Sequence, residues 1–70
     1  MTKPQDTRKV QQELRDAGFQ PGHQVSSHTT WFRPSGVKIT VPDGHRQISA
    51  GVYGTIVRTI TEATSREERN

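Results

Sequence analysis

Three histidines are the residues of this sequence best suited to proton transfer near neutral pH: His23, His28 and His45. A neutral imidazole can take a proton from a ribose 2′-hydroxyl, and an imidazolium can give one to a leaving oxygen. His28 ends the run Ser26-Ser27-His28, directly before a segment that we expect to be a strand. Two interpretations of His28 stay open on this pattern, a catalytic histidine or an ordinary structural or solvated one.

The sequence gives less support for a metal site or a hydrolase triad built from the histidines. Their intervals along the chain match no ligand pattern of a metal site, and Asp43 is the only carboxylate close to one of them in sequence. Ser27, His45 and Asp43 have the residue types of a hydrolase triad, but no nucleophile elbow presents the serine. The chain has no Cys, which excludes thiolate ligands, disulfides and Cys nucleophiles. We therefore expect neither a metal nor another cofactor.

Charge and composition describe one small basic domain. The chain has 70 residues, a net charge of +3, a pI near 10.0 and a mean hydropathy of −0.90. A chain of this size forms a thin core, so we expect a single domain over residues 1–70, with 1–5 and 64–70 flexible. No apolar run approaches the roughly 20 residues that span a bilayer, and residues 1–6 lack the apolar stretch of a secretory signal. We expect a soluble cytoplasmic protein, compatible with a polyanionic partner such as nucleic acid.

Two apolar stripes with helical spacing indicate a helix at each end of the domain. The first lies between Asp6, at the position of an N-cap, and Gly18, at the position of a terminating glycine, and Phe19 can fold back onto its end. The second is predicted over 49–63, with Ser49 as its cap. The stripes consist of Val10, Leu14 and Ala17 in the first helix and of Val52, Ile56 and Ile60 in the second, beside Tyr53 and Val57.

A β-rich stretch separates the two helices. Residues 29–33 and 37–41 are rich in β-branched or aromatic side chains and flank the turn signal Pro34-Ser35-Gly36. The polar stretch that ends at Ser27 signals a third strand only weakly. The order helix, two or three antiparallel strands, helix predicts an α+β sandwich with both helices on one face of the sheet.

The length of the turn sets which side chains of these strands are buried. If Ser35-Gly36 is a two-residue loop, Phe32 pairs with Ile39 and Trp31 pairs with Thr40. The core face then holds Phe32, Val37, Ile39 and Val41, and the open face holds Trp31, Arg33, Lys38 and Thr40. On that open face Trp31 could stack on a base or anchor a protein partner. The alternative is that Trp31 covers the sheet edge or fills a second small core.

The order of these motifs resembles one known family. Ser26-Ser27-His28 is followed by a short strand, the turn Pro34-Ser35-Gly36 and a strand that ends in Val41-Pro42. This pattern resembles the HicA family, the small ribonuclease toxins of bacterial HicA–HicB toxin–antitoxin pairs. Leu14–Phe19 is similar to the family's Leu-x-x-x-Gly-Phe helix end, and Ile48–Val52 to the start of its last helix. The resemblance covers about residues 8–62.

The resemblance implies a double-stranded-RNA-binding-domain-like fold, with a helix, a three-stranded antiparallel sheet and a second helix. It also implies metal-independent endonucleolytic cleavage of mRNA, with His28 as general acid or base, and a HicB-like antitoxin protein as partner. On this hypothesis Ser27 orients the phosphate or His28. Arg33, Lys38 and Arg46 bind the RNA backbone, because phosphate contacts supply most of the affinity for RNA.

One position departs from the family pattern. Ser26 stands where the family has Gly. If that Gly provides a positive φ or a close approach to phosphate, Ser26 impairs substrate binding. The alternative to an enzyme is a non-catalytic RNA- or protein-binding module, such as a degenerate, phage-encoded HicA-like protein.

Overall fold

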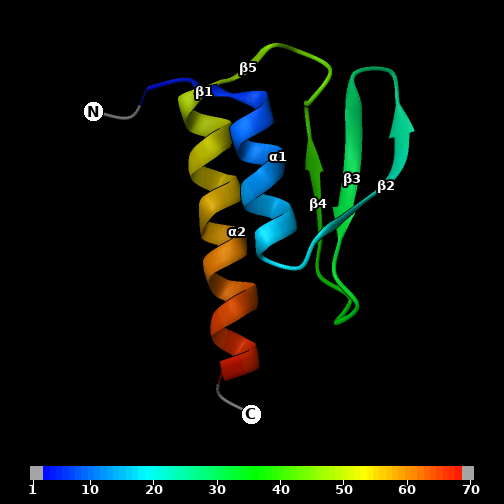
Figure 1. The fold of residues 1–70 in the computed structure, drawn as a ribbon, viewed down its shortest axis with the longest axis vertical. Coiled ribbons are helices and arrows are strands. Elements are labelled where there is room, and N and C mark those ends of the chain that lie inside the picture. The colour runs from blue at the N-terminus through cyan, green and yellow to red at the C-terminus, as the bar shows by residue number, and fades with distance from the viewer. Residues whose placement is uncertain (1–2, 69–70) are drawn as a thin grey trace.

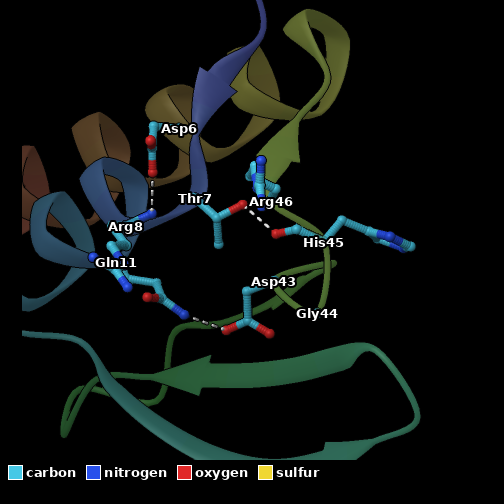
Figure 2. A pocket seen from close by; sticks show the side chains of 8 residues that line it. All are labelled: Asp6, Thr7, Arg8, Gln11, Asp43, Gly44, His45 and Arg46. Atoms are coloured by element: carbon cyan, nitrogen blue, oxygen red, sulfur yellow. Dashed lines mark hydrogen bonds between the residues drawn. The ribbon is translucent and has the colours of Figure 1, made fainter.

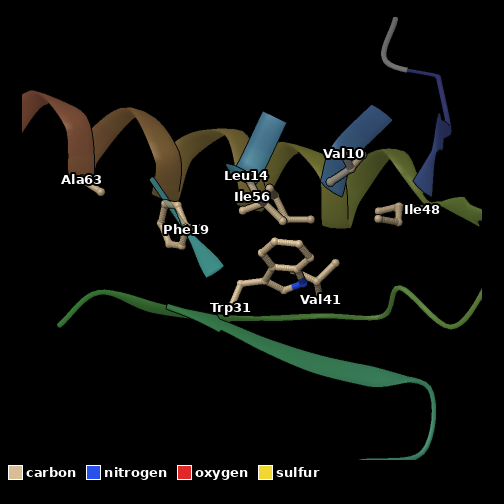
Figure 3. Packing of buried hydrophobic residues seen from close by; sticks show 8 residues of the cluster. All are labelled: Val10, Leu14, Phe19, Trp31, Val41, Ile48, Ile56 and Ala63. Carbon is tan, nitrogen blue, oxygen red and sulfur yellow. The ribbon is translucent and has the colours of Figure 1, made fainter. Parts of the chain in front are cut away.

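The computed structural model describes residues 3–68, with side chains through Ser65, and folds them into two helices and five short strands. Three of the strands form an antiparallel sheet in the order β2-β3-β4, and the two shortest, β1 and β5, pair with each other. Both helices lie on one side of the three-stranded sheet (Figures 1 and 3), which confirms the expected α+β arrangement. The elements are β1 Gln5–Asp6, α1 Thr7–Asp16, β2 Gln20–Val25, β3 His28–Phe32, β4 Lys38–Val41, β5 Gln47–Ile48 and α2 Ala50–Glu68.

The ends of α1 follow the local signals of the sequence. The Asp6 carboxylate accepts a hydrogen bond from the Arg8 backbone N–H at 2.9 Å, as an N-cap does. At the other end Gly18 has φ +90°. The Phe19 N–H donates to the Leu14 carbonyl at 2.9 Å, which is the 6→1 hydrogen bond of a Schellman motif. Phe19 then turns back into the core. The predicted cap and the predicted terminator of α1 are confirmed.

The core lies between the helices and the sheet, with Trp31 at its centre (Figure 3). Ile56 is fully buried, which confirms the predicted inner face of α2, whereas Val52 and Ile60 are half-buried and Val57 is exposed. The buried apolar residues are Val10, Leu14, Phe19, Trp31, Val41, Ile48, Ile56 and Ala63.

The turn between β3 and β4 is one residue longer than expected. The Arg33 N–H donates to the Val37 carbonyl and the Gly36 N–H donates to the Arg33 carbonyl, both at 2.9 Å, so three residues form the loop. Gly36 has φ +102°, the conformation that such a loop requires at its last residue. Phe32 therefore pairs with Lys38 rather than with Ile39, and the predicted register is wrong by one residue.

This slip exchanges the two faces of β3. Trp31 is 1% exposed and Arg33 is 7% exposed, on the side of the helices, while Phe32 is 37% exposed on the other side. The prediction that Trp31 and Arg33 lie on the open face, with Phe32 in the core, is therefore wrong. Because side chains alternate along a strand, one residue of slip moves every side chain of the strand to the opposite face. In β4 the expected faces hold, with Val41 buried and Lys38 exposed.

Secondary structure extends further toward both termini than expected. Helix α2 continues to Glu68, beyond its predicted end at residue 63, and 69–70 lie outside the described residues, while the flexibility of 64–70 stays a prediction. Gln5 pairs with Ile48 in a short strand that was not predicted, while the flexibility of 1–5 stays a prediction. Among the described residues, neither helix combines the length and apolar content needed to cross a membrane.

One polar contact joins the two helices. The Tyr53 hydroxyl donates to the Glu13 carboxylate, with both O···O distances at 3.0 Å. Partial burial, this hydrogen bond and the negative charge of Glu13 raise the pKa of Tyr53 above its ordinary value of 10.0. The neutral form of Tyr53 is therefore the one that the fold favours.

Candidate functional site

The turn before His28 has an unusual backbone. Ser26 and Ser27 form a two-residue connection between β2 and β3, closed by the pairing of Val25 with His28. Ser26 has φ +55°, a left-handed conformation that residues with a Cβ adopt at a cost of about 1–2 kcal/mol. This is the position at which the HicA pattern has Gly. The departure noted in the sequence thus falls on a residue whose backbone conformation favours glycine.

His28 stands at the start of β3 with its side chain exposed. It belongs to the side of the sheet that faces away from the helices, because Thr29, the next residue, is buried against them. Within the part of the chain that the structure describes, no side chain forms a hydrogen bond with the imidazole. The ring is thus exposed, and no side-chain hydrogen bond from residues 3–65 fixes its orientation.

The loop from 43 to 46 packs against this turn. The Gly44 N–H donates to the Ser27 carbonyl at 2.9 Å, and a Cβ on Gly44 would lie 2.5 Å from the Ser27 Cβ. The Thr7 hydroxyl donates to the His45 carbonyl at 2.6 Å, and the Thr7 N–H donates to the Arg46 carbonyl at 3.0 Å. The start of α1, the loop and the β2–β3 turn therefore meet at one end of the molecule, the upper end in Figure 1.

Asp43 ties this end together through three hydrogen bonds. Its carboxylate accepts from the Thr29 hydroxyl at 2.7 Å, from the Trp31 indole N–H at 3.1 Å and from the Gln11 amide at 3.3 Å. It thereby holds the loop to β3 and to α1. Sequence reasoning considered Asp43 as the carboxylate near His45 and as the acid of a triad, and missed this role. The signal that could have found it is the buried Trp, whose N–H needs an acceptor.

Two shallow depressions flank the Asp43 carboxylate. The larger, of about 470 Å³, lies between α1 and the loop (Figure 2) and contains acidic and basic side chains. The smaller, of about 250 Å³, shares Gln11 and Asp43 with it. His28 lines neither. The larger depression is lined by Asp6, Thr7, Arg8, Gln11, Asp43, Gly44, His45 and Arg46.

The structure brings together only some of the predicted RNA-binding residues. Ser27 and His28 are neighbours, and Arg46 lies at the same end of the molecule with its side chain exposed. Lys38 is exposed but starts β4 opposite Phe32, at the far end of the sheet. Four residues of β3 separate it from the level of His28, which is roughly 13 Å along a strand.

Two of the residues predicted to bind RNA are buried. The Arg33 guanidinium lies over the Phe19 ring, 5.7 Å from its centroid, and the side chain is 7% exposed rather than on the open face, while its contact with a phosphate stays a prediction. Trp31 packs in the main core and donates to Asp43, so neither the predicted exposed position nor the alternative of the sheet edge or a second small core is what the structure has. Among the described residues, no three His, Asp or Glu side chains cluster closely enough to hold a metal ion.

Comparisons of the chain with protein-family models, with curated proteins and with solved structures find no match in any of the three.

Proposed function

We propose that this protein is a HicA-like endoribonuclease with a double-stranded-RNA-binding-domain-like fold, which cleaves mRNA without a metal through His28. The observation that carries the proposal is the position of His28. It is an exposed histidine directly after a two-residue turn, and the turn has a positive φ where the HicA pattern has Gly. The order of helix, three antiparallel strands and helix supports the same proposal.

The proposed chemistry is general acid–base catalysis of phosphodiester cleavage. As base, His28 takes the proton of a ribose 2′-hydroxyl, and the oxygen attacks the adjacent phosphorus. The bond from phosphorus to the 5′-oxygen of the next nucleotide breaks, and that oxygen gains a proton from solvent. The products are a 2′,3′-cyclic phosphate and a 5′-hydroxyl. As acid, an imidazolium at the same position protonates the leaving oxygen instead.

Exposed groups near His28 are available to hold the RNA. Ser27 is its neighbour in the turn, and Arg46 adds a positive charge at the same end of the molecule. Lys38 contacts the phosphate backbone of an RNA strand that lies along the sheet. A HicB-like antitoxin would inhibit the enzyme by covering His28, which the described residues leave open to solvent.

A ribonuclease assay with matched histidine variants tests the proposal. His28→Ala should lose about 10²–10⁴-fold in cleavage rate, the usual contribution of one acid–base group. His23→Ala is the control, since His23 is an exposed histidine in the middle of β2. Both variants should melt at the wild-type temperature, and cleavage should continue in EDTA. Equal cleavage by wild type and His28→Ala would contradict the proposal.

A non-catalytic RNA- or protein-binding module is the second candidate. Two observations favour it: no side chain orients His28 within the described residues, and Ser26 occupies a conformation suited to glycine. Ser26→Gly distinguishes the two functions. A gain of cleavage in Ser26→Gly identifies a weakened nuclease. If wild type and Ser26→Gly both bind RNA and leave it intact, the protein is the module.

A further inference from the structure

The three-stranded sheet has one face that no other part of the described chain covers. We call it the open sheet face and define it by His28, Thr30 and Phe32 of β3 and by Lys38 and Thr40 of β4. Residues paired across antiparallel strands share a face, and Thr30 pairs with Thr40 and Phe32 with Lys38. His28 belongs to the same face because it is two residues from Thr30. The helices cover the opposite face (Figure 3).

Phe32 provides an aromatic surface on the open sheet face. Its ring lies against Gly22 of β2, where a Cβ would be 3.1 Å from both Cδ1 and Cε1. Gly22 thus allows the ring to rest directly on the backbone of the neighbouring strand. The side chain remains 37% exposed, although it is one of the largest apolar side chains of the protein. The backbone of β2 supports the ring from one side, so little side-chain entropy is lost when a ligand stacks on it.

The charge of the open sheet face favours an anion. From Ala17 to Pro42 the chain has no Asp or Glu, and the segment carries Lys38, an exposed cation, beside Phe32. Asp43, the next acidic residue, is turned to the other side of the sheet, where it bonds Trp31. The other described carboxylates are those of Asp6, Glu13, Asp16 and Glu62, on α1, its cap and α2.

We propose that the open sheet face binds single-stranded RNA, with a base stacked on Phe32 and a backbone phosphate on Lys38. An exposed ring beside a cation matches the two groups of a single-stranded nucleotide, a base with a free face and a phosphate. A single strand fits this surface better than a duplex, because the bases inside a duplex are already stacked on one another. The proposal rests on the proposed function in one respect: it places the bound strand on the same face as His28.

Binding of an RNA that the protein cannot cleave tests this surface. The probe is a fluorescent 2′-O-methyl oligoribonucleotide of about 12 nucleotides, within the range of single-strand site sizes. Its 2′-oxygen cannot attack the phosphate. Phe32→Leu keeps an apolar side chain without the ring and should weaken binding by about five- to a hundredfold, whereas Phe32→Tyr keeps the ring and should bind as wild type does. Val57→Ala is the control, because Val57 is 39% exposed on α2.

The salt dependence of the same measurement tests Lys38. Lys38→Gln should lower the slope of log Kd against log salt by about one unit if the ammonium contacts a phosphate. Lys9→Gln on α1 removes an equal charge from an exposed lysine outside the open sheet face and should leave the slope unchanged. Thermal melts of all variants establish that each is folded. If removal of the ring lowers the stability of Phe32→Leu, the affinity of Phe32→Tyr for the probe still tests the role of the ring.

The outcomes separate this inference from the proposed function. Unchanged affinity in folded Phe32→Leu, equal affinity for single strand and duplex, or no binding of the probe by wild type would each overturn the inference. The last result, together with a protein partner that buries Phe32, would assign the face to protein binding. Cleavage that depends on His28 but not on Phe32 would support the proposed endoribonuclease and overturn RNA binding by the open sheet face. Binding that depends on Phe32, without any cleavage of unmodified RNA, would support RNA binding by the open sheet face and overturn the proposed endoribonuclease.

Discussion

Replacing Gly44 by Ala probes the contact between the loop and the turn that carries His28. The added Cβ would lie 2.5 Å from the Ser27 Cβ and 2.7 Å from its Cα, distances that real structures do not contain. Because the obstacle is backbone, the loop must move away, and the 2.9 Å hydrogen bond from the Gly44 N–H to the Ser27 carbonyl is lost. Overpacking costs about 1–3 kcal/mol and a lost hydrogen bond about 0.5–1.5 kcal/mol, so we expect a loss of about 2–4 kcal/mol.

Gly54→Ala is the matched control for this substitution. Gly54 lies inside α2, and a Cβ there would meet nothing within 4 Å. Ala is favoured over Gly inside a helix by about 0.8–1.0 kcal/mol, so this variant should be more stable than wild type. In a domain of this size each kcal/mol shifts the melting temperature by roughly 4–8 °C. Calorimetry or urea unfolding should therefore show changes of opposite sign, and wild-type stability in Gly44→Ala would refute the geometry.

Three further substitutions test the core, the turn and the contact between the helices. Ile56→Ala should lower the free energy of unfolding by about 2–5 kcal/mol in urea unfolding, whereas Val57→Ala, at a neighbouring but exposed position, should change it by less than about 0.5 kcal/mol. Ser26→Gly should raise the free energy of unfolding by up to about 1 kcal/mol, since glycine removes the strain at φ +55°. Ser35→Gly in the exposed β3–β4 loop is the control and should lower it. A gain at Ser35 or a loss at Ser26 in thermal melts would contradict a strained backbone at Ser26. Because the pKa of Tyr53 is raised, its hydrogen bond stabilises the fold below pH about 10 and is lost as the pH rises through the folded-state pKa. Above pH about 10 the stability of wild type should therefore fall more than that of Tyr53→Phe. Circular dichroism melts at several pH values would show this difference.

The Asp43 network links the core to the candidate site. Trp31 fills the centre of the core, and its N–H reaches the same carboxylate that fixes the loop at Gly44. The loop in turn packs against Ser27, the residue before His28. A chain of contacts therefore connects the Trp31 side chain to the turn of the candidate site. Trp31, which the sequence suggested as a direct RNA ligand, packs in the core.

Features of this protein that depend on neighbouring residues were predictable from its sequence. The Asp6 cap, the Gly18 terminator and the apolar stripe of α1 each arise from contacts within a few positions along the chain, and the structure has all of them. The alternation in β4 was also predictable, since it needs only the period of a strand and the identity of Val41 and Lys38. The motif that suggests catalysis, Ser27-His28 after a turn, is local in the same sense.

Tertiary structure alone decided which face of β3 is buried. Both Trp31 and Phe32 are large and apolar, so the sequence pattern could not rank them, and one extra residue in the loop before Val37 exchanged their places. The fold selects Trp31 because the core has an acceptor for its N–H at Asp43, and Phe32 has no such group to satisfy. The pairing of Gln5 with Ile48 likewise depends on a partner distant in sequence. Contacts between segments far apart in the chain follow from three-dimensional packing, and no local pattern specifies them.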